Sequence, residues 1–377
     1  MKKKNILILS AGRADYHLLK NLIIELKKNI KFNIFFTITG THLSKKYGST
    51  IKEINQDKIR INQMIKTNLR SSTNISILNS INKITKNLYY FIKKNNINLL
   101  LVLGDRFEIF CAAYVCNILR IPIAHIHGGE LTAGSYDDNW RHCITKLSNF
   151  HFVSTKIYQK RVIQMGEDPK YVFNVGSLGV ENALKFKNKI IKNKKILKKQ
   201  ILVCYHSATN NIKKSRRDFV SLLKALKSFK EFTIIFTAPN YDLDSDFIIK
   251  EINLFIKKNK NSKLVKSFGQ EKFFNYIQNS NFIIGNSSSG IIEVPSLNIP
   301  FINIGDRQKG RVQSKSTFNT NGSSKSIIKT IRKVIACDTF NFHNPYFKKN
   351  CSKNIITILK NIDLNINREK KFFDVKY

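Results

Sequence analysis

Residues 99–130 read LLLVLGDRFEIFCAAYVCNILRIPIAHIHGGE, and this stretch determines the fold class that the sequence predicts. The uninterrupted apolar run Leu99–Leu103 is typical of a strand buried on both faces. Residues 107–119 carry a helical pattern, and residues 122–126 form a second short apolar strand. Strand, helix and strand in so short a span make one βαβ unit, which requires parallel strands with helices on the faces of the sheet.

The same alternation extends in both directions along the chain. Further strands are predicted at 5–10, 32–38, 151–154, 171–175, 201–205, 232–237, 282–285 and 300–304, with helices between them and late helices at 324–335 and 353–359. Between about 181 and 200 the pattern dissolves into Lys, Asn and Ile. We therefore predict an α/β protein with two Rossmann-like, doubly wound domains facing each other across a cleft. The first spans 1–182, a basic linker spans 183–200, and the second spans 201–377, with the last helix packing back on the first domain.

The length and composition agree with two domains and a cytoplasmic location. The chain has 377 residues, of which 42% are hydrophobic, enough for two cores. Residues 1–10 read as a short basic run followed by a strand, which is not the pattern of a signal peptide, and no apolar run approaches the ~20 residues of a membrane span. The cysteines show no metal-site spacing and are expected to be reduced thiols: Cys111, Cys116, Cys143, Cys204, Cys337 and Cys351.

The formal net charge of +40 raises the question of a nucleic-acid partner. Lysine is mixed with Asn and Ile along the whole chain, and these residues share A/T-rich codons. The basic stretch 185–199 also lacks the interleaved aromatic residues of a single-strand binding platform. We therefore predict a solvated basic surface without a nucleic-acid or membrane partner, and a preference for anionic substrates.

In open parallel sheets ligands bind beyond the carboxyl ends of the strands, so we expect the site residues in the loops that follow the strands. In Ser10-Ala-Gly-Arg-Ala-Asp15, the backbone amides and Arg13 are placed to meet a phosphate; the alternative is a turn in which Asp15 caps the following helix. In Gly104-Asp105-Arg106 the acid lies where substrates dock; the alternative is a helix N-cap with Arg106 as its ion-pair partner.

The densest polar cluster runs from His125 to Glu130 and on through residues 136–142. It combines histidines, carboxylates and adjacent glycines directly after a predicted strand. Such a cluster favours proton transfer. Metal binding is the weaker alternative, because neither an HxxxH spacing nor a cysteine companion is present.

The second half has one comparable loop, Gly285-Asn-Ser-Ser-Ser-Gly290, with Glu293 about one turn into the next helix. Serine hydroxyls and exposed amides at a helix start favour a phosphate site, and Glu293 is placed to accept hydrogen bonds from ribose hydroxyls. The alternative is an ordinary serine N-cap. His206, after the strand at 201–205, adds a titratable group to the same region.

Taken in order, these motifs resemble those of the hydrolysing UDP-N-acetylglucosamine 2-epimerases, especially the bacterial branch that serves sialic acid synthesis. The resemblance covers most of the chain. The matching stretches are 12–15 (GRAD), 39–43 (TGTHL), 103–110 (LGDRFEIF), 121–130 (IPIAHIHGGE), 137–142 (DDNWRH), 285–296 (GNSSSGIIEVPS) and 303–311 (NIGDRQKGR).

The resemblance implies a fold like that of GT-B glycosyltransferases, with UDP held mostly by the second domain, and a homodimer. It implies conversion of UDP-N-acetylglucosamine and water to N-acetylmannosamine and UDP, through anti elimination to 2-acetamidoglucal followed by hydration, without NAD or an essential metal. By motif position, the acid–base group comprises Asp105, Asp138 and His206. The substrate contacts comprise Arg13, His42, Glu130, Ser288, Ser289, Gly290, Glu293, Arg307 and Arg311.

The sequence departs from the family pattern at two places. Many relatives have Glu where this chain has His127, which makes His127 a candidate for proton transfer, as base or acid. After His206 the chain reads Ser207-Ala208, where relatives usually have Pro and a polar residue. Three other functions stay open: the same chemistry on a UDP-2,4-diacetamido-trideoxyhexose of the legionaminic acid route, a GT-B glycosyltransferase, and a non-catalytic protein that binds nucleotide sugar or nucleic acid.

Overall fold

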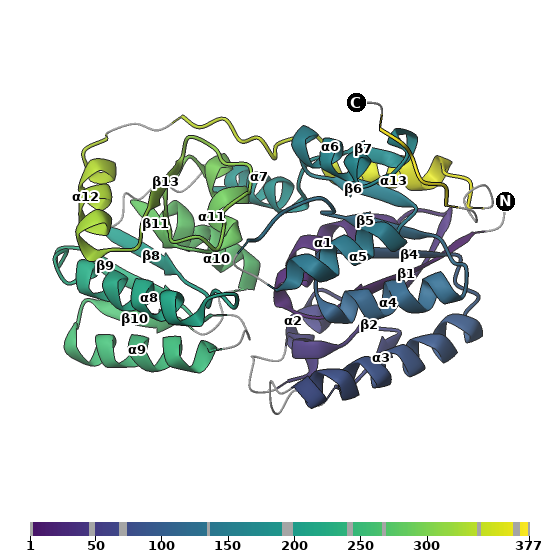
Figure 1. Ribbon diagram of the computed structural model, residues 1–377, viewed down its shortest axis with the longest axis horizontal. Helices are drawn as coiled ribbons and strands as arrows, with labels where there is room; N and C mark the ends of the chain where they lie inside the picture. The colour runs from purple at the N-terminus through teal and green to yellow at the C-terminus, as the bar shows by residue number, and fades with distance from the viewer. Residues whose placement is uncertain are drawn as a thin grey trace. The chain divides into compact units, whose positions relative to one another are not determined.

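The computed structural model describes residues 3–44, 50–67, 74–133, 136–190, 199–239, 244–265, 269–337, 341–364 and 370–375. The chain forms two α/β units, which confirms the predicted fold class (Figure 1). The first unit comprises Met1–Glu130, Asp137–Glu181 and Lys348–Tyr377, and the second comprises Leu131–Tyr136 and Asn182–Phe347.

The first unit contains a seven-stranded sheet in the order β3-β2-β1-β4-β5-β6-β7, and the paired strands are parallel. Each strand is short and apolar, as a sheet covered on both faces requires. The strands are β1 Lys4–Ser10, β2 Phe32–Ile38, β3 Gln63–Met64, β4 Leu99–Leu103, β5 Ile123–Ile126, β6 Phe150–Val153 and β7 Val172–Asn174.

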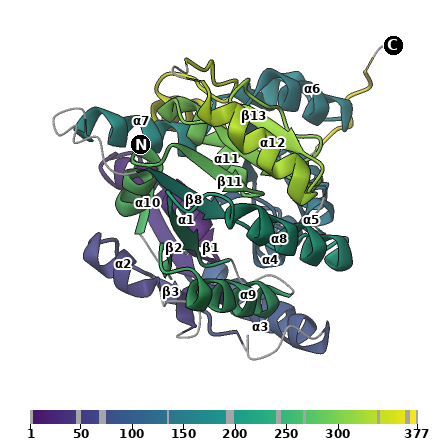
Figure 2. The same ribbon diagram turned by 90° about the vertical axis from the view of Figure 1, so that its left-hand side faces the viewer.

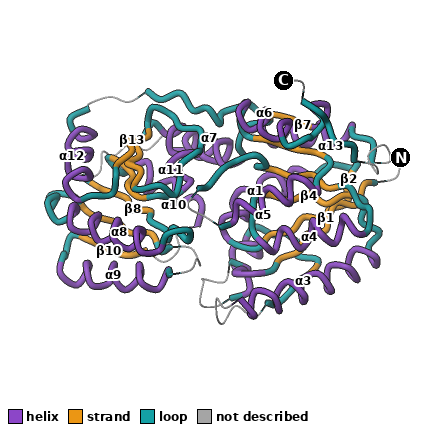
Figure 3. The backbone as a smooth tube through the Cα atoms, viewed as in Figure 1, coloured by secondary structure: helices purple, strands orange, loops and turns teal. Residues whose placement is uncertain are grey.

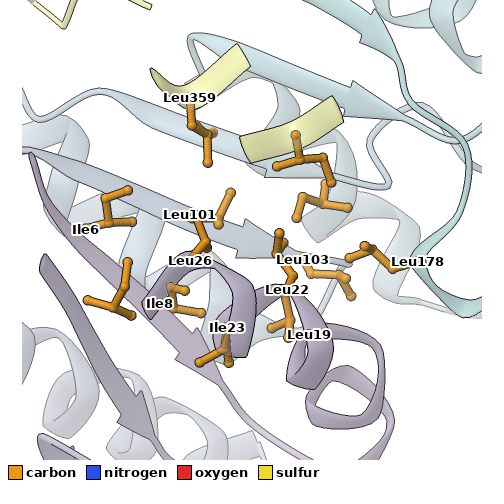
Figure 4. Close-up of a cluster of buried hydrophobic side chains, with 14 of the residues drawn as sticks. Ile6, Ile8, Leu19, Leu22, Ile23, Leu26, Leu101, Leu103, Leu178 and Leu359 are labelled. Atoms are coloured by element: carbon orange, nitrogen blue, oxygen red, sulfur yellow. The ribbon is translucent and has the colours of Figure 1, made fainter. Parts of the chain in front are cut away.

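Helices cover both faces of this sheet because side chains alternate along each strand. Ile6 and Ile8 of β1 pack in one core with α1 (Arg13–Lys27), α2 (Ile51–Gln56) and α13 (Cys351–Asn361), which Figure 4 shows in part. Leu7 and Leu9 pack in the opposite core. That core contains α3 (Asn74–Lys94), α4 (Phe107–Ile118) and α5 (Asp137–Leu147); α6 (Lys156–Gln164) lies between β6 and β7 in the chain.

The second unit contains a six-stranded sheet in the order β10-β9-β8-β11-β12-β13, again with parallel pairs. One core joins its strands to α8, α9 and α12, which lie side by side in Figure 2. The elements are β8 Gln200–Cys204, α8 Ile212–Leu226, β9 Thr233–Thr237, α9 Ser245–Lys258, β10 Ser262–Val265, α10 Gly269–Gln278, β11 Phe282–Gly285, α11 Ser288–Ile292, the 3₁₀ turn Val294–Leu297, β12 Phe301–Ile304, β13 Thr317–Thr320 and α12 Ser324–Ile335.

The junction between the halves differs from the predicted linker at 183–200. Helix α7 (Leu178–Ile190) occupies residues 183–190, residues 191–198 lie outside the described part, and β8 begins at Gln200. Residues 183–190 of the predicted linker therefore belong to helix α7, which Figure 3 shows as a helix. No helix within the described ranges has the length and hydropathy needed to cross a membrane.

In each sheet the strand order reverses once, between β1 and β4 in the first unit and between β8 and β11 in the second. Doubly wound sheets bind ligands beyond the carboxyl ends of the strands at this reversal. The loop after β1 leads into the first turn of α1, which carries Asp15, and the loop after β4 carries Asp105. The loops after β8 and β11 carry His206 and the triple serine. The topology therefore places the predicted site residues at the expected edge of each sheet.

Candidate active site

Asp15 lies in the first turn of α1, directly after the loop that follows β1. Its carboxylate accepts hydrogen bonds from the backbone amides of Ala11 (2.6 Å) and Gly12 (3.3 Å) and from the hydroxyl of Ser10 (3.1 Å). These amides were candidates for a phosphate site, and Asp15 takes them instead. The capping alternative therefore holds for this loop.

Arg13 and His42, both predicted to bind substrate, lie at the same edge of the first sheet. Arg13 is the first residue of α1, and burial lowers the pKa of its guanidinium while the charge of Glu53 opposes that shift. The His42 Nε2 atom lies 2.8 Å from the Ser10 hydroxyl. Burial lowers the pKa of His42 to about 3, so its imidazole is neutral near pH 7 and can exchange hydrogen bonds but carries no charge.

Arg141 on α5 joins Asp105, Asp138 and His127. Its guanidinium forms an ion pair with Asp105, its Nε lies 3.6 Å from Asp138 Oδ1, and its Nη1 donates to the His127 carbonyl at 2.9 Å. The Arg141 side chain is 3% exposed. A buried guanidinium with several acceptors fixes the relative positions of the groups it binds. The loops after β4 and β5 and the first turn of α5 thus meet at one point.

Arg141 was not predicted as a site residue, although it belongs to a matching motif. The available signal was its place one helical turn after Asp138. The alternative for Asp105 is also corrected, since Arg106 pairs with the buried Glu108 (3.1 and 3.2 Å), not with Asp105. The charge of Glu108 raises the pKa of Arg106. The N-cap of α4 is Arg106, so Asp105 does not cap that helix.

His127 lies in a strained conformation beside Glu130. Its φ angle is 68°, a left-handed value that few non-glycine residues adopt. The Glu130 Oε1 atom lies 3.0 Å from His127 Nδ1 and accepts a 2.8 Å hydrogen bond from the Ser154 hydroxyl. A carboxylate accepts hydrogen bonds, so in the tautomer that donates from Nδ1 to Glu130 the Nε2 atom of the ring carries the lone pair.

The Nε2 atom of His127 is buried and has no hydrogen-bond partner among the residues that the structure describes. Its geometry therefore suits it to accept a proton from a ligand. His125 differs. Burial lowers its pKa to about 3, and its Nε2 lies 2.8 Å from the Gly104 carbonyl, so it supports the loop that leads into Asp105. The described residues contain no group of three or more His, Cys, Asp or Glu side chains that could hold a metal ion.

In the second unit Asn286 fixes the backbone at His206. The His206 amide donates to Asn286 Oδ1 at 2.7 Å, and Asn286 Nδ2 donates to the His206 carbonyl at 2.8 Å. The two residues follow the neighbouring parallel strands β11 and β8. One amide side chain thus joins the loop of His206 to the triple-serine turn. Asn286 belongs to a matching motif but was not identified from the sequence as a site residue.

Two glycines allow the triple-serine turn to lie close to the sheet. Gly285 has a φ of 146°, and a Cβ there would lie 2.0 Å from the Cys204 carbonyl oxygen. A Cβ at Gly290 would lie 2.4 Å from the Phe301 ring, so Gly290 is a close-packing position beneath α11. Ser287 is the N-cap of α11 but makes no side-chain capping bond, which the ordinary serine N-cap would require. Ser288 and Ser289 follow it and are half-buried.

The remaining predicted contacts lie in and after the same turn. Glu293 is buried at the end of α11. Arg307 Nη1 donates to the Asn286 carbonyl at 3.2 Å, which brings a cation to the serine turn. Arg311 donates instead to the Thr132 hydroxyl at 3.0 Å.

The family described as "UDP-N-acetylglucosamine 2-epimerase" matches residues 24–360. The chain is 37% identical to the polysialic acid biosynthesis protein P7 of Escherichia coli, over 99% of this chain and 98% of that protein. It is also 37% identical to a GDP/UDP-N,N'-diacetylbacillosamine 2-epimerase (hydrolyzing) of Campylobacter jejuni, over the full length of both.

Among solved structures, the UDP-GlcNAc 2-epimerase of Neisseria meningitidis bound to UDP-GlcNAc superposes with a TM-score of 0.78 at 19% identity, over 95% of this chain and 100% of that one. The S. aureus MnaA–UDP structure gives a TM-score of 0.80 at 16% identity, over 99% of this chain and 100% of that one. At these identities the likeness concerns the fold.

Proposed function

The chain belongs to the UDP-N-acetylglucosamine 2-epimerase family, and from that premise we propose that it is a hydrolysing epimerase that converts UDP-N-acetylglucosamine and water to N-acetylmannosamine and UDP. The observation that carries the proposal is the cluster that the buried Arg141 forms with Asp105, Asp138 and His127. It provides carboxylates and an imidazole at the edge of a sheet where ligands of this fold bind.

The reaction places two demands on a protein. A base must take the C2 proton while the C1–O bond to UDP breaks, which gives 2-acetamidoglucal, UDP and a protonated base. Water then adds across the double bond: its hydroxyl goes to C1, and a proton returns to C2 in the manno configuration. The C2 proton is only weakly acidic, so the negative charge that develops on departing UDP must be stabilised as well.

The first unit meets the demand for proton transfer. We assign Asp105, Asp138 and His127, together with His206 of the second unit, to the acid–base group. The Nε2 atom of His127, which has no hydrogen-bond partner within the described part of the chain, is proposed as a proton acceptor, with Glu130 orienting the ring through Nδ1. Neutral His42 and the Arg13 guanidinium are proposed to bind the sugar and the phosphate, respectively.

The second unit meets the demand for charge stabilisation. We propose that Ser288, Ser289 and the main chain at Gly290 bind the pyrophosphate, with Arg307 as the nearby cation and Glu293 as acceptor for the ribose hydroxyls. Arg311 is a further proposed contact. The proposed scheme requires neither NAD nor a metal, and the active species is proposed to be a homodimer.

A second substrate is favoured by one specific observation. The diacetylbacillosamine epimerase of Campylobacter jejuni is as similar to this chain as the polysialic acid protein, at 37% identity. Its name assigns it the same hydrolysing 2-epimerisation on a sugar that carries a second acetamido group. UDP-N,N'-diacetylbacillosamine is therefore the second candidate.

Proton NMR in heavy water tests the proposal. Purified protein is incubated separately with UDP-N-acetylglucosamine and with UDP-N,N'-diacetylbacillosamine, and the kcat/KM values are compared. The expected products are N-acetylmannosamine with deuterium at C2, and UDP. In ¹⁸O-water the label should appear at C1 of the sugar and not in UDP. Protium retained at C2, or transfer of the sugar to an added acceptor without epimerisation, would exclude the elimination route. A larger kcat/KM for the second sugar would change the substrate while leaving the chemistry intact.

A further inference from the structure

Residues 370–373 lie against the carboxyl end of helix α5 in the first unit. The Lys370 ammonium donates to the backbone carbonyls of Lys146 (2.5 Å), Ser148 (2.7 Å) and Thr145 (3.4 Å). Helix α5 ends at Leu147, so these carbonyls belong to its last turn and the residue beyond it. A cation at this position satisfies carbonyls that have no partner within the helix and interacts favourably with the helix dipole.

The same segment is attached to the turn that follows α6. The Phe373 amide donates to the Gly166 carbonyl at 3.0 Å. The Phe372 ring lies on Gly166 so closely that a Cβ there would be 2.3 Å from it. The Lys146 ammonium, from α5, lies 5.1 Å from the centre of the Phe372 ring. The segment thus joins the ends of two helices that are separate in the sequence.

Glu167 connects these contacts. Its carboxylate is 3% exposed and lies 2.7 Å from the Lys370 ammonium, 2.7 Å from the Lys146 ammonium and 2.9 Å from His151 Nε2. Burial alone would raise the pKa of Glu167, but the hydrogen bond and charge of His151 and the charge of Lys370 lower it to about 2. Lys370 is therefore one of the groups that hold a buried carboxylate in its ionised form.

The other end of α5 carries the proton-transfer cluster. Asp138 lies in its first turn, and Arg141 one turn later binds Asp105 and the His127 carbonyl. The helix has 11 residues and is about 16 Å long. Since a helix moves as a rigid rod, a tilt or slide at its carboxyl end is transmitted to Asp138 and Arg141. Misplacement of reacting groups by about 1 Å can reduce turnover about a hundredfold.

We propose that Lys370 is a positioning residue: it anchors α5 and thereby holds Asp138 and Arg141 in the geometry that catalysis requires. Phe372 supports it by fixing the segment on Gly166. This inference rests on the proposed function, because it gives a role in catalysis to a residue at the carboxyl end of the helix that carries Asp138 and Arg141.

The test compares Lys370→Ala with Lys371→Ala. Lys371 is the next residue along the chain and is exposed. Because both residues are lysines, the two variants change the net charge equally. For Lys370→Ala we expect kcat to fall about tenfold while KM and the dissociation constant for UDP stay within twofold of the parent values. Lys370→Arg, which keeps the cation, should recover most of the loss. Phe372→Ala should give a smaller loss in the same direction, with Phe373→Ala as its control. Rates are normalised to UDP-binding sites, so that incompletely folded protein does not count.

Hydrogen exchange provides a readout that does not depend on turnover. In Lys370→Ala the amides of α5 should exchange faster than in Lys371→Ala, and those of α8 should be unchanged. A kcat within twofold of the parent with unchanged α5 exchange would overturn the proposal, as would equal losses in Lys370→Ala and Lys371→Ala. If the parent protein does not turn over either UDP-sugar while α5 exchange still responds to Lys370, then the proposed function fails and the anchoring contact stands.

Discussion

The two units share a sheet topology but build their candidate site residues from different chemistry. In the first unit the central interactions are between charges: Arg141 with Asp105 and Asp138, and His127 beside Glu130. In the second unit the central residue is Asn286, whose neutral amide exchanges two hydrogen bonds with the backbone at His206. The absence of a side chain at Gly285 and Gly290 lets the backbone there pack against Cys204 and Phe301.

This difference underlies the proposed division of roles, in which the first unit moves protons and the second unit binds UDP. Carboxylates and imidazoles can give a proton to a ligand or take one from it, which acid–base chemistry requires. Neutral amides, hydroxyls and close-packed glycines leave protonation unchanged but hold backbone groups in fixed positions. Substitutions in the first unit should therefore affect turnover, and those in the second should affect nucleotide affinity or local stability.

The largest effect is expected for Asp105→Asn. The amide keeps the shape of the side chain but removes the charge that faces Arg141 and the ability to exchange a proton. General acid–base groups contribute about 10²–10⁴-fold to rate, so we expect kcat to fall by about 10³-fold. The UDP dissociation constant, measured by calorimetry, should be unchanged. Asp168→Asn, which changes a carboxylate elsewhere in the first unit, is the matched control. A near-parental rate for Asp105→Asn would contradict the division of labour.

The next largest effect concerns stability and belongs to the second unit. Gly285→Ala forces a methyl group to within 2.0 Å of the Cys204 carbonyl at a φ that L-residues rarely adopt, so we expect a loss of about 3 kcal/mol or more. Gly269→Ala is the control, because Gly269 also has a positive φ but no atom of the described residues lies within 4 Å of the added carbon. A loss of about 1 kcal/mol is expected there.

The single tryptophan allows the two units to be followed separately in that experiment. It is Trp140, on α5 of the first unit, so its fluorescence reports that unit, whereas far-UV circular dichroism reports both. In denaturant, Gly285→Ala should shift part of the dichroism transition and leave the Trp140 transition in place. If both transitions shift together, the units unfold cooperatively and cannot be treated as separate for stability.

The sequence predicted the fold well because the information lies in single segments. The buried run Leu99–Leu103 and the late helix at 324–335 were located without error at both ends. The strands that were missed, such as β10 (Ser262–Val265) and β13 (Thr317–Thr320), lie at the edges of the second sheet. Edge strands are short and partly polar, so their pattern does not distinguish them from loops.

The site was less predictable because its interactions join distant segments. The motifs located Asp105 and Asp138, but nothing local shows that Arg141, and not the adjacent Arg106, is the partner of Asp105. Likewise, Asn286 and His206 are 80 residues apart, and only the pairing of β8 with β11 makes them neighbours. The roles assigned to individual residues in catalysis and binding stay predictions.

A moderate effect is expected for Asn286→Ala. The substitution removes two hydrogen bonds to the His206 backbone, each worth about 1 kcal/mol. UDP should therefore bind about 10–30-fold more weakly. The loss in kcat, measured at saturating substrate, should be smaller than the loss in kcat/KM. Asn286→Asp keeps the acceptor for the His206 amide and loses the donor to its carbonyl, and should fall in between. Asn319→Ala, in β13 of the same sheet, is the control. An equal loss in kcat and kcat/KM would show that Asn286 acts on turnover and not on UDP affinity, which would contradict the proposed role of the second unit.

The smallest effect is a dependence of stability on pH that originates in the first unit. Burial lowers the pKa of His125 to about 3, below its value of about 6.5 in the unfolded chain, so between these values the unfolded state binds more protons. The stability that His125 contributes is therefore fully present above pH 6.5 and is lost as the pH falls toward 3, by at most ~1.4 kcal/mol per pH unit. His125→Gln keeps a donor for the Gly104 carbonyl but cannot titrate. Between pH 7 and 5 its free energy of unfolding, measured by Trp140 fluorescence, should fall less steeply than that of the parent. If the two slopes are equal, the pKa of His125 does not differ between the folded and the unfolded state. Burial would then not keep its imidazole neutral, and the contrast between the two units would be weaker.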